Sequence, residues 1–133
     1  MTNVLIDTNV FIYALNADSE YHDKCVRLLY GEEQLFTTSK NISEYFAVCS
    51  KLNIDSHLIW TFYNSLLTNV TLLYPNEISM KIFEELILKY KPSGNRVFDI
   101  EIVSIMLSSG LAEIATLNHK DFLLVTEINL FRF

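Results

Sequence analysis

The sequence predicts an α/β domain in which helices flank a central, mainly parallel β-sheet. Short apolar segments rich in branched residues alternate along the chain with longer segments whose apolar positions have helical spacing. Residues suited to begin a helix stand before most of the longer segments. The 133 residues are 50% hydrophobic and include only 3 Gly and 2 Pro. A folded core is therefore expected, and extended disorder is excluded.

Five segments are predicted as strands because they are short, apolar and bounded by polar or turn-forming residues. They are residues 3–6, 34–37, 70–74, 112–116 and 128–131. The polar segment 117–122, between the last two strands, is predicted to form a turn. The chain length suits one domain, 1–133, without a linker or an internal repeat.

Six segments are predicted as helices from their apolar spacing and their capping residues. The first is residues 9–15, and the second is capped by Ser19 and ends at Gly31. The third is capped by Thr38 or Ser39, and the fourth begins at Asp55. The fifth runs from the Asn76 cap to about Tyr90, and the sixth is residues 97–109, before Gly110. The last of them is apolar on nearly every side and should be deeply buried. Leu58, Leu67 and Ile78 are among the apolar positions expected to face inward.

Composition excludes several classes of protein. The chain has 10 Lys and Arg against 16 Asp and Glu, a net charge of −6, so an extended basic surface for nucleic acid is not expected, although local clustering matters more than the sum. The glycines are too far apart for a nucleotide-binding loop. Cys25 and Cys49 are interpreted as free core thiols in a reducing compartment. No leader peptide and no membrane-length apolar segment is visible, which predicts a cytoplasmic protein with no membrane partner.

Two carboxylates stand where a solvated surface does not explain them. Asp7 directly follows the first strand, so it should lie at the ligand-binding edge of the sheet. Asp99 lies within the most apolar helix and needs a cation, a metal or hydrogen-bond donors, unless it only interacts with the first-turn amides of its own helix. Glu44, near a helix start, is by itself an ordinary surface residue. Asn118 and Asp121 follow a strand, where a simple turn also uses such residues.

These polar residues fall in four segments with the sequences VLIDTNVF, ISEYF, RVFDI and IATLNHKDF, at residues 4–11, 42–46, 96–100 and 114–122. In this order they resemble the motifs of the PIN-domain ribonucleases, most closely the VapC-type toxins of prokaryotic toxin–antitoxin pairs. The resemblance extends over nearly the whole chain. It implies a PIN-like three-layer sandwich and a metal-dependent endoribonuclease.

The resemblance also implies roles for individual residues. Asp7, Glu44 and Asp99 correspond to the acidic triad that holds the family's metal and is needed for catalysis. Asn118 stands at the fourth catalytic position, where many members have Asp, and Asp121 is the alternative fourth ligand. Because an amide oxygen binds Mg²⁺ less strongly than a carboxylate, we expect one tight metal and a weaker second one.

Further positions of the motifs support the site or contact the substrate. Thr8, Asn9 and Thr116 match positions that support the metal site through hydroxyl or amide contacts. Lys40 and Arg96 precede two of the acidic residues and are candidates for contacting RNA phosphates, although surface solvation is the favoured explanation for either of them taken singly.

The expected chemistry follows from the carboxylates. A cluster of like charges is unfavourable without a cation, and all-oxygen ligands favour Mg²⁺ or Mn²⁺. Such an ion lowers the pKa of a bound water for in-line attack on a phosphodiester, which leaves 5′-phosphate and 3′-hydroxyl ends. The resemblance implies an RNA substrate and an antitoxin protein that covers the cleft. The high aromatic content, 13%, favours a homodimer as well.

Other classes of protein remain as alternatives. Haloacid-dehalogenase-type phosphatases and response-regulator receivers also have an aspartate after the first strand. The phosphatases need a second Asp two residues later, where this chain has Asn9, and the receivers need an acidic pair, of which only Asp7 is present. Both classes are therefore disfavoured. A PIN-fold module that binds RNA or protein without efficient catalysis is a closer alternative, and Asn118 is its main support.

Overall fold

The computed structural model describes residues 2–133, which contain one five-stranded sheet in the order β3-β2-β1-β4-β5. Every pair of neighbouring strands is parallel. The strands are β1 (Asn3–Ile6), β2 (Gln34–Thr38), β3 (Val70–Leu73), β4 (Glu113–Ala115) and β5 (Asn129–Leu130). The predicted strands are therefore confirmed, and the first strand of the chain is the central one.

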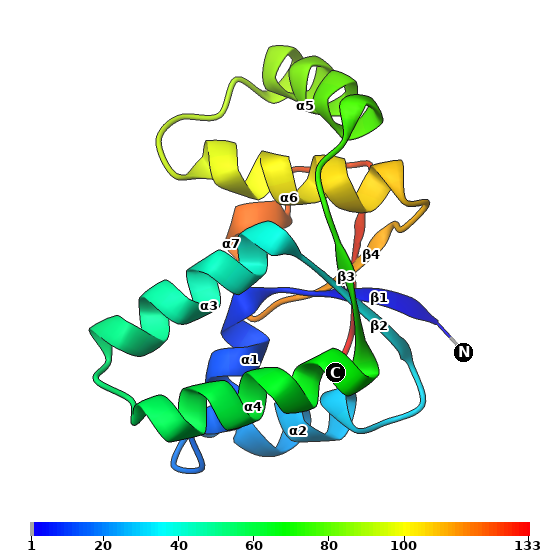
Figure 1. The fold of residues 1–133 in the computed structure, drawn as a ribbon. Coiled ribbons are helices and arrows are strands. Elements are labelled where there is room, and N and C mark those ends of the chain that lie inside the picture. Colours follow the sequence, from blue (N-terminus) through cyan, green and yellow to red (C-terminus); the bar gives the residue numbers. More distant parts are fainter. Residues whose placement is uncertain (1) are drawn as a thin grey trace.

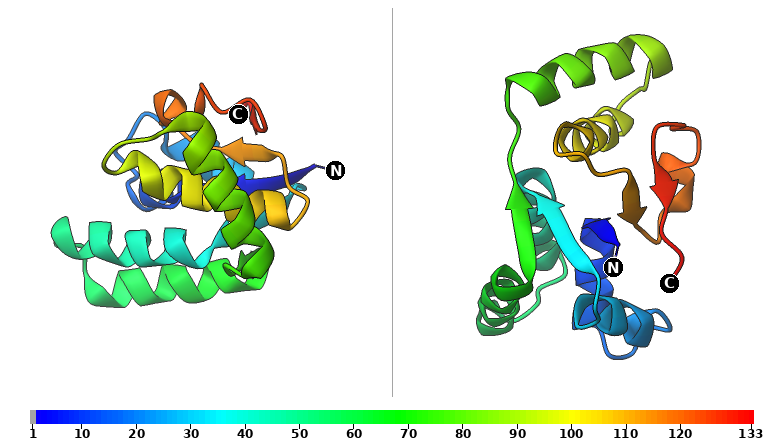
Figure 2. Two further views of the ribbon diagram at one scale, coloured as in Figure 1. Left: turned by 90° about the horizontal axis from the view of Figure 1, so that it is seen from above. Right: turned by 90° about the vertical axis from the view of Figure 1, so that its right-hand side faces the viewer.

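Seven helices accompany this sheet within the described residues (Figure 1). They are α1 (Thr8–Leu15), α2 (His22–Leu29), α3 (Ser39–Lys51), α4 (Ser56–Asn69), α5 (Glu77–Tyr90), α6 (Arg96–Ser108) and α7 (His119–Phe122). In the right-hand view of Figure 2, α5 and α6 lie above the strands, α1, α2 and α4 lie below them, and α3 is partly hidden behind β2. The predicted α/β sandwich of three layers is confirmed.

Alternation along β1 shows how the layers are joined. Val4 and Ile6 belong to the apolar core on the side of α1 to α4, whereas Leu5 belongs to the core on the side of α6. All three side chains are completely buried. Successive residues of a strand point to opposite faces, so one apolar strand supplies both cores, as expected for a parallel sheet covered on both sides.

Side-chain caps explain where several helices begin. Thr38 Oγ1 accepts a hydrogen bond from the Asn41 amide at 3.1 Å, Asp55 accepts from Leu58 at 3.3 Å, and Asn76 accepts from the Ser79 amide at 2.8 Å. Each bond satisfies a first-turn N–H group that has no partner inside its helix. These three predicted starts are confirmed.

Ser19, predicted to cap the second helix, does not cap α2. Its hydroxyl accepts a hydrogen bond from the Tyr21 amide at 3.1 Å, whereas α2 itself begins at His22 without a side-chain cap. Ser19 therefore stabilises the turn that leads into the helix.

Some inward-facing positions were predicted wrongly. Leu58 and Leu67 of α4 are 44% and 45% exposed, and Ile78 of α5 is 63% exposed. Both helices lie at the outside of the molecule and bury narrow stripes, such as Ile59 and Leu66 in α4. Residues 119–122, predicted as part of a turn, form the short helix α7.

Two predictions that follow from the apolar composition concern the cysteines and the lack of a membrane-spanning segment. Cys25 and Cys49 are both buried and free, as predicted. Burial raises the pKa of the Cys25 thiol to about 11, so it behaves as an apolar core side chain. Across residues 2–133, none of the helices has both the length and the apolarity needed to cross a bilayer.

Candidate active site

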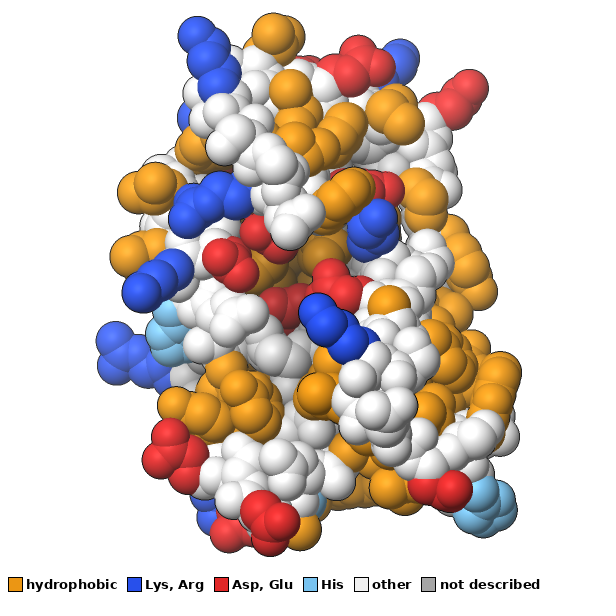
Figure 3. Space-filling view, turned by 90° about the vertical axis from the view of Figure 1, so that its left-hand side faces the viewer, with side chains coloured by type: hydrophobic (Ala, Val, Ile, Leu, Met, Phe, Trp, Pro, Cys, Tyr) orange, Lys and Arg blue, Asp and Glu red, His pale blue; other side chains and the backbone are white. Residues whose placement is uncertain are grey.

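A cavity of about 790 Å³ opens at the carboxyl edge of the sheet. Its walls come from the end of β1, from α1, α3 and α6, and from the segment around α7. Figure 3 shows this face of the molecule with a hollow lined by Asp and Glu side chains and with Lys and Arg side chains at its rim. The sequence-predicted residues that line the cavity are Asp7, Thr8, Asn9, Glu44, Arg96, Asp99, Asn118 and Asp121.

Asp7 is the most constrained of the acidic residues, with only 6% of its surface exposed. Its Oδ1 accepts hydrogen bonds from the Thr8 amide at 2.9 Å and from Asn41 Nδ2 at 3.1 Å. Its Oδ2 accepts from Thr116 Oγ1 at 2.8 Å and from Asn9 Nδ2 at 3.1 Å. With four donors the carboxylate is held in one orientation, and its charge is partly compensated.

Asn9 and Thr116 connect Asp7 to the far end of the sequence. Asn9 Nδ2 donates to Thr116 Oγ1 at 3.1 Å, and Asn9 Oδ1 accepts from the Leu117 amide at 3.0 Å. Thr116 Oγ1 also accepts from the Asn118 amide at 3.1 Å. The segment after β4 is thereby fixed against α1, which brings Asn118 to the cavity wall.

Asn41 is a site residue that the sequence analysis missed. It is completely buried, and its Nδ2 donates both to Asp7 and, at 3.1 Å, to Thr8 Oγ1. Its Oδ1 accepts from the Thr38 hydroxyl at 2.7 Å and from the Thr38 amide at 3.3 Å. The pair Thr38 and Asn41 forms a capping box at the start of α3, and that three-residue spacing was the available signal.

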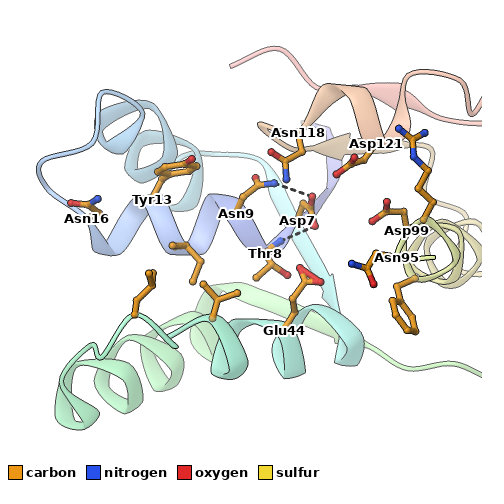
Figure 4. A pocket seen from close by; sticks show the side chains of 15 residues that line it. Asp7, Thr8, Asn9, Tyr13, Asn16, Glu44, Asn95, Asp99, Asn118 and Asp121 are labelled. Carbon is orange, nitrogen blue, oxygen red and sulfur yellow. Dashed lines mark hydrogen bonds between the residues drawn. The ribbon is translucent and has the colours of Figure 1, made fainter. Parts of the chain in front are cut away.

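Three further carboxylates face Asp7 across the cavity. Figure 4 shows Glu44 pointing up from α3, Asp99 pointing inward from α6 and Asp121 pointing down from α7. These side chains come from three separate segments, yet all line the same cavity as Asp7. The carboxyl edge of the sheet thus gathers four negative groups in one place.

The electrostatics of this cluster favour protonation. The pKa of Asp7 is raised to about 6, mainly by burial and to a smaller extent by the charges of Glu44 and Asp121, against the opposing hydrogen bonds from Thr116 and Thr8. The pKa of Asp99 is raised to about 7, first by burial and then by the charges of Asp121, Asp7 and Glu44. Carboxyl groups with such values are typical of sites that bind a cation or perform acid–base chemistry.

The donor set suits a hard divalent ion. The cavity offers carboxylate oxygens and the Asn118 amide, with no thiol and no imidazole among its lining residues, and such ligands are preferred by Mg²⁺ and Mn²⁺. As the side chains lie, no three His, Cys, Asp or Glu residues within residues 2–133 are close enough to hold an ion together. Gathering the carboxylates around an ion requires side-chain movements and would relieve their mutual repulsion.

The two basic candidates lie in different surroundings. Arg96, at the start of α6, lines the cavity, and its charge lowers the pKa of Asp99. Lys40 lies outside the lining residues. Its Nζ lies 4.0 Å from the centre of the Phe98 ring and 3.9 Å from Glu101. Of the two side chains, Arg96 is the one that lines the cavity together with Asp7, Asp99 and Asp121.

Comparison with known proteins adds one family and several solved structures. The family model of the PIN domain matches residues 4–127. Similar structures include VapBC2 from Rickettsia felis bound to a promoter DNA fragment, with 18% identity, 99% of each chain covered and a TM-score of 0.78. VapBC-1 from nontypeable Haemophilus influenzae gives 22% identity, 98% and 97% coverage and a TM-score of 0.70.

A third similar structure is VapC20 from Mycobacterium tuberculosis, described as a toxin that cleaves the sarcin–ricin loop, with 15% identity, 84% and 86% coverage and a TM-score of 0.66. At these identities the solved structures establish the shared fold. No curated protein sequence matches the chain.

Proposed function

Because the chain belongs to the PIN-domain family, we propose that it is a metal-dependent endoribonuclease and the toxin of a VapC-type toxin–antitoxin pair. The observation that carries the proposal is the convergence of Asp7, Glu44, Asp99 and Asp121 on one cavity at the carboxyl edge of a parallel sheet. Structurally similar proteins include a toxin–antitoxin complex and a member of the VapBC family of toxin–antitoxin systems. Another, VapC20, is described as a toxin that cleaves the sarcin–ricin loop.

Asp7, Glu44 and Asp99 are proposed as the ligands of Mg²⁺ or Mn²⁺, with Asn118 or Asp121 as the fourth. A bound divalent ion supplies charge neutralisation at the phosphate and a more acidic water. Asp7 contributes rigidity, because its four hydrogen bonds fix the position of its oxygens before any ligand arrives. Thr8, Asn9 and Thr116 act through Asp7 and the segment after β4, as positioning residues.

The negative charge of the cavity should make RNA binding depend on a divalent ion. Four carboxylates repel the phosphodiester backbone of RNA, and Arg96 is the cation at the cavity wall. RNA should therefore bind productively only together with a divalent ion. This dependence separates the proposed enzyme from a simple RNA-binding module.

The decisive experiment is cleavage of a panel of structured RNAs by the purified protein. We expect cleavage with Mg²⁺ or Mn²⁺, no cleavage with EDTA, and products with 5′-phosphate and 3′-hydroxyl ends. Asp7→Ala and Asp99→Ala should each lower the rate by at least about 100-fold, since both position and charge of the ion are affected. Glu44→Ala should lower it nearly as much. Cleavage that persists in EDTA and leaves 2′,3′-cyclic ends would contradict the proposal.

The proposed partners follow from the same site. An antitoxin segment that presents Arg or Lys to the acidic cavity would neutralise it and block RNA. Homodimer formation is proposed from the apolar surface, where Trp60 is 53% exposed. Light scattering tests the dimer, and co-purification with the product of a neighbouring open reading frame tests the antitoxin. An RNA substrate also implies a cytoplasmic protein.

A PIN-fold module with weak or no catalysis remains the second candidate. It is favoured by Asn118, because an amide stands where many members have a carboxylate. In that case RNA or protein would bind without metal-dependent cleavage. The same RNA panel, read by both binding and cleavage, separates the two candidates.

A further inference from the structure

The cavity continues beyond its acidic residues into a second part without charged side chains. This apolar arm consists of Ile12, Tyr13, Asn16, Val48 and Leu52. The first three residues come from α1 and its C-terminal end, and the other two from α3 and its C-terminal end. Figure 4 shows Tyr13 and Asn16 on the opposite side of Asp7 from Asp99 and Asp121. One continuous cavity therefore joins a charged half and an apolar half.

Helix α1 sets the distance between the two halves. Asp7 is the N-cap of this helix and Tyr13 lies six residues later, which corresponds to about 9 Å along the helix axis at 1.5 Å per residue. A phosphate held at the acidic end would therefore leave a neighbouring nucleotide within reach of Tyr13.

Tyr13 offers a supported aromatic surface. It is half-buried, and it packs edge-on against Tyr21 with ring centres 5.1 Å apart and an interplanar angle of 66°. The backbone around it is fixed as well, because the Tyr13 carbonyl oxygen lies 3.0 Å from His22 Nδ1. On the facing wall, Leu52 is 56% exposed although it is a large apolar residue. The arm thus presents a ring and an unfilled apolar wall.

Asn16 supplies a polar group at the end of the arm. Its Oδ1 accepts a hydrogen bond from the Asp18 amide at 3.1 Å, so the other end of the side-chain amide, Nδ2, is left as a donor. In Figure 4 this nitrogen is on the side of the Asn16 amide that faces Tyr13. An aromatic face combined with a fixed hydrogen-bond donor is a common arrangement for recognising an unpaired nucleobase.

We propose that the apolar arm binds one unpaired nucleobase of the RNA, stacked on Tyr13 and accepting a hydrogen bond from Asn16 Nδ2. This proposal rests on the proposed ribonuclease function and adds a specificity site to it. The absence of any cation among the five residues of the arm makes it unsuited to a phosphate. Because the apolar arm and the acidic half form one cavity, the base bound in the arm should belong to the same RNA whose phosphate lies at the acidic residues.

Stacking can be measured without cleavage. RNA oligonucleotides carrying 2-aminopurine at successive positions are titrated with the protein in Ca²⁺ and in EDTA, since the fluorescence of this base falls when it stacks. We expect quenching concentrated at one or two adjacent positions. Tyr13→Leu, which keeps apolar volume, should abolish that quenching and weaken binding by about 10-fold. Tyr13→Phe should keep both, because it retains the ring.

Cleavage of RNAs with a single abasic position first tests the base site in the wild-type protein, where no substitution can disturb folding. The wild type should cut the RNA that lacks the stacked base about 10-fold less efficiently, and Tyr13→Leu should cut this RNA and the intact RNA equally. Tyr30→Leu is the matched control, because Tyr30 is 59% exposed and lines a different cavity; it should behave as the wild type. Melting temperatures check that each variant is folded.

The outcomes separate this proposal from the proposed function. If the protein cuts RNA with a divalent ion, but neither the abasic position nor Tyr13→Leu changes the rate, the base site is wrong and the ribonuclease function stands. An absence of both binding and cleavage for every RNA would overturn both. If Tyr13→Leu releases a co-purified protein partner while RNA cleavage is unchanged, the arm binds a peptide and the proposal is wrong.

Discussion

Nδ2 of Asn41 lies 3.1 Å from Oδ1 of Asp7, in a contact between two buried side chains 34 residues apart in sequence. The bond joins the start of α3 to the end of β1. Because the same amide group also completes the capping box of α3 with Thr38, one side chain fixes both the helix start and the orientation of the acidic residue. The contacts that orient Asp7 in the candidate active site therefore also stabilise the fold.

Replacement of Asn41 should destabilise the fold. Asn41→Ala removes the side-chain half of the capping box and one donor to Asp7, and it leaves the Thr38 amide and hydroxyl without their acceptor. We therefore expect the free energy of unfolding to fall by about 2 kcal/mol. Urea denaturation measures the change. Asn64→Ala is the matched control, because Asn64 is exposed within α4, and it should change stability by less than about 0.5 kcal/mol. Equal effects of the two substitutions would show that the Asn41 contacts do not stabilise the fold.

Stability without divalent ions should fall as pH rises. The folded-state pKa values of about 6 for Asp7 and about 7 for Asp99 exceed the ordinary value of 3.8, so the folded protein binds these protons more tightly than the unfolded chain. The resulting stabilisation is complete below about pH 4 and is lost as pH rises to about 7. Asp99→Asn should flatten this dependence and raise the melting temperature at pH 7.5 by roughly 3–5 °C, equivalent to about 1 kcal/mol after solvent screening.

Divalent ions provide the complementary measurement on the same variant. At pH 7.5, millimolar Mn²⁺ should raise the melting temperature of the wild type, because an ion that binds only the folded state stabilises it. Asp99→Asn should respond much less. Asp18→Asn is the control, since Asp18 is exposed and does not line the cavity. If Asp99→Asn is destabilising and the wild type does not respond to Mn²⁺, Asp99 is a structural helix-start residue.

The fourth ligand can be identified by comparing Asn118→Ala with Asp121→Ala. The sequence motif favours Asn118, whereas the charge of Asp121 raises the pKa values of both Asp7 and Asp99, which favours Asp121. We expect the Asp121 substitution to lower the cleavage rate about 100-fold and the Asn118 substitution about 10-fold. Single-turnover rates at saturating Mg²⁺ measure this difference. A larger loss for Asn118→Ala would assign the fourth position to the amide.

Arg96 and Lys40 should differ in their contribution to RNA binding. Arg96 lines the cavity, whereas Lys40 is engaged by the Phe98 ring and Glu101. Arg96→Ala should raise the KM for RNA several-fold and reduce the dependence of binding on salt, as loss of one phosphate contact does. Lys40→Ala should leave KM within about two-fold of the wild type. A larger effect of Lys40→Ala would place the RNA across α3 and α6.

The sequence predicted the fold well where local chemistry decides. Caps at Thr38, Asp55 and Asn76 and short apolar runs determined nearly every element. Burial on the outer helices was predicted less well, because apolar periodicity identifies a stripe but not its width. Ile78 continues the apolar pattern of α5 but faces outward, and only the packing of α5 on α6 decides which side is covered.

The site residues also differ in how far the sequence alone identifies them. Asp7 at a strand end and Asp99 in an apolar helix are unusual by themselves, so sequence reasoning could single them out. Glu44 and Asp121 look like surface residues, and only the resemblance to a family pointed to them. The spacing of Thr38 and Asn41 indicates a capping box, but the contact of Asn41 with Asp7 joins two different elements and could not be predicted from that local pattern.

Parallel pairing of β1 with both β2 and β4 has a consequence for synthesis on the ribosome. Thr116, which donates to Asp7, follows it by 109 residues, and translation of that interval at 5–20 residues per second takes about 5 to 20 s. During this time the central strand lacks one neighbour, and the acidic cluster lacks its partners from the later segments. The acidic cavity therefore cannot be completed on the nascent chain until the segment that contains Thr116 has been synthesised.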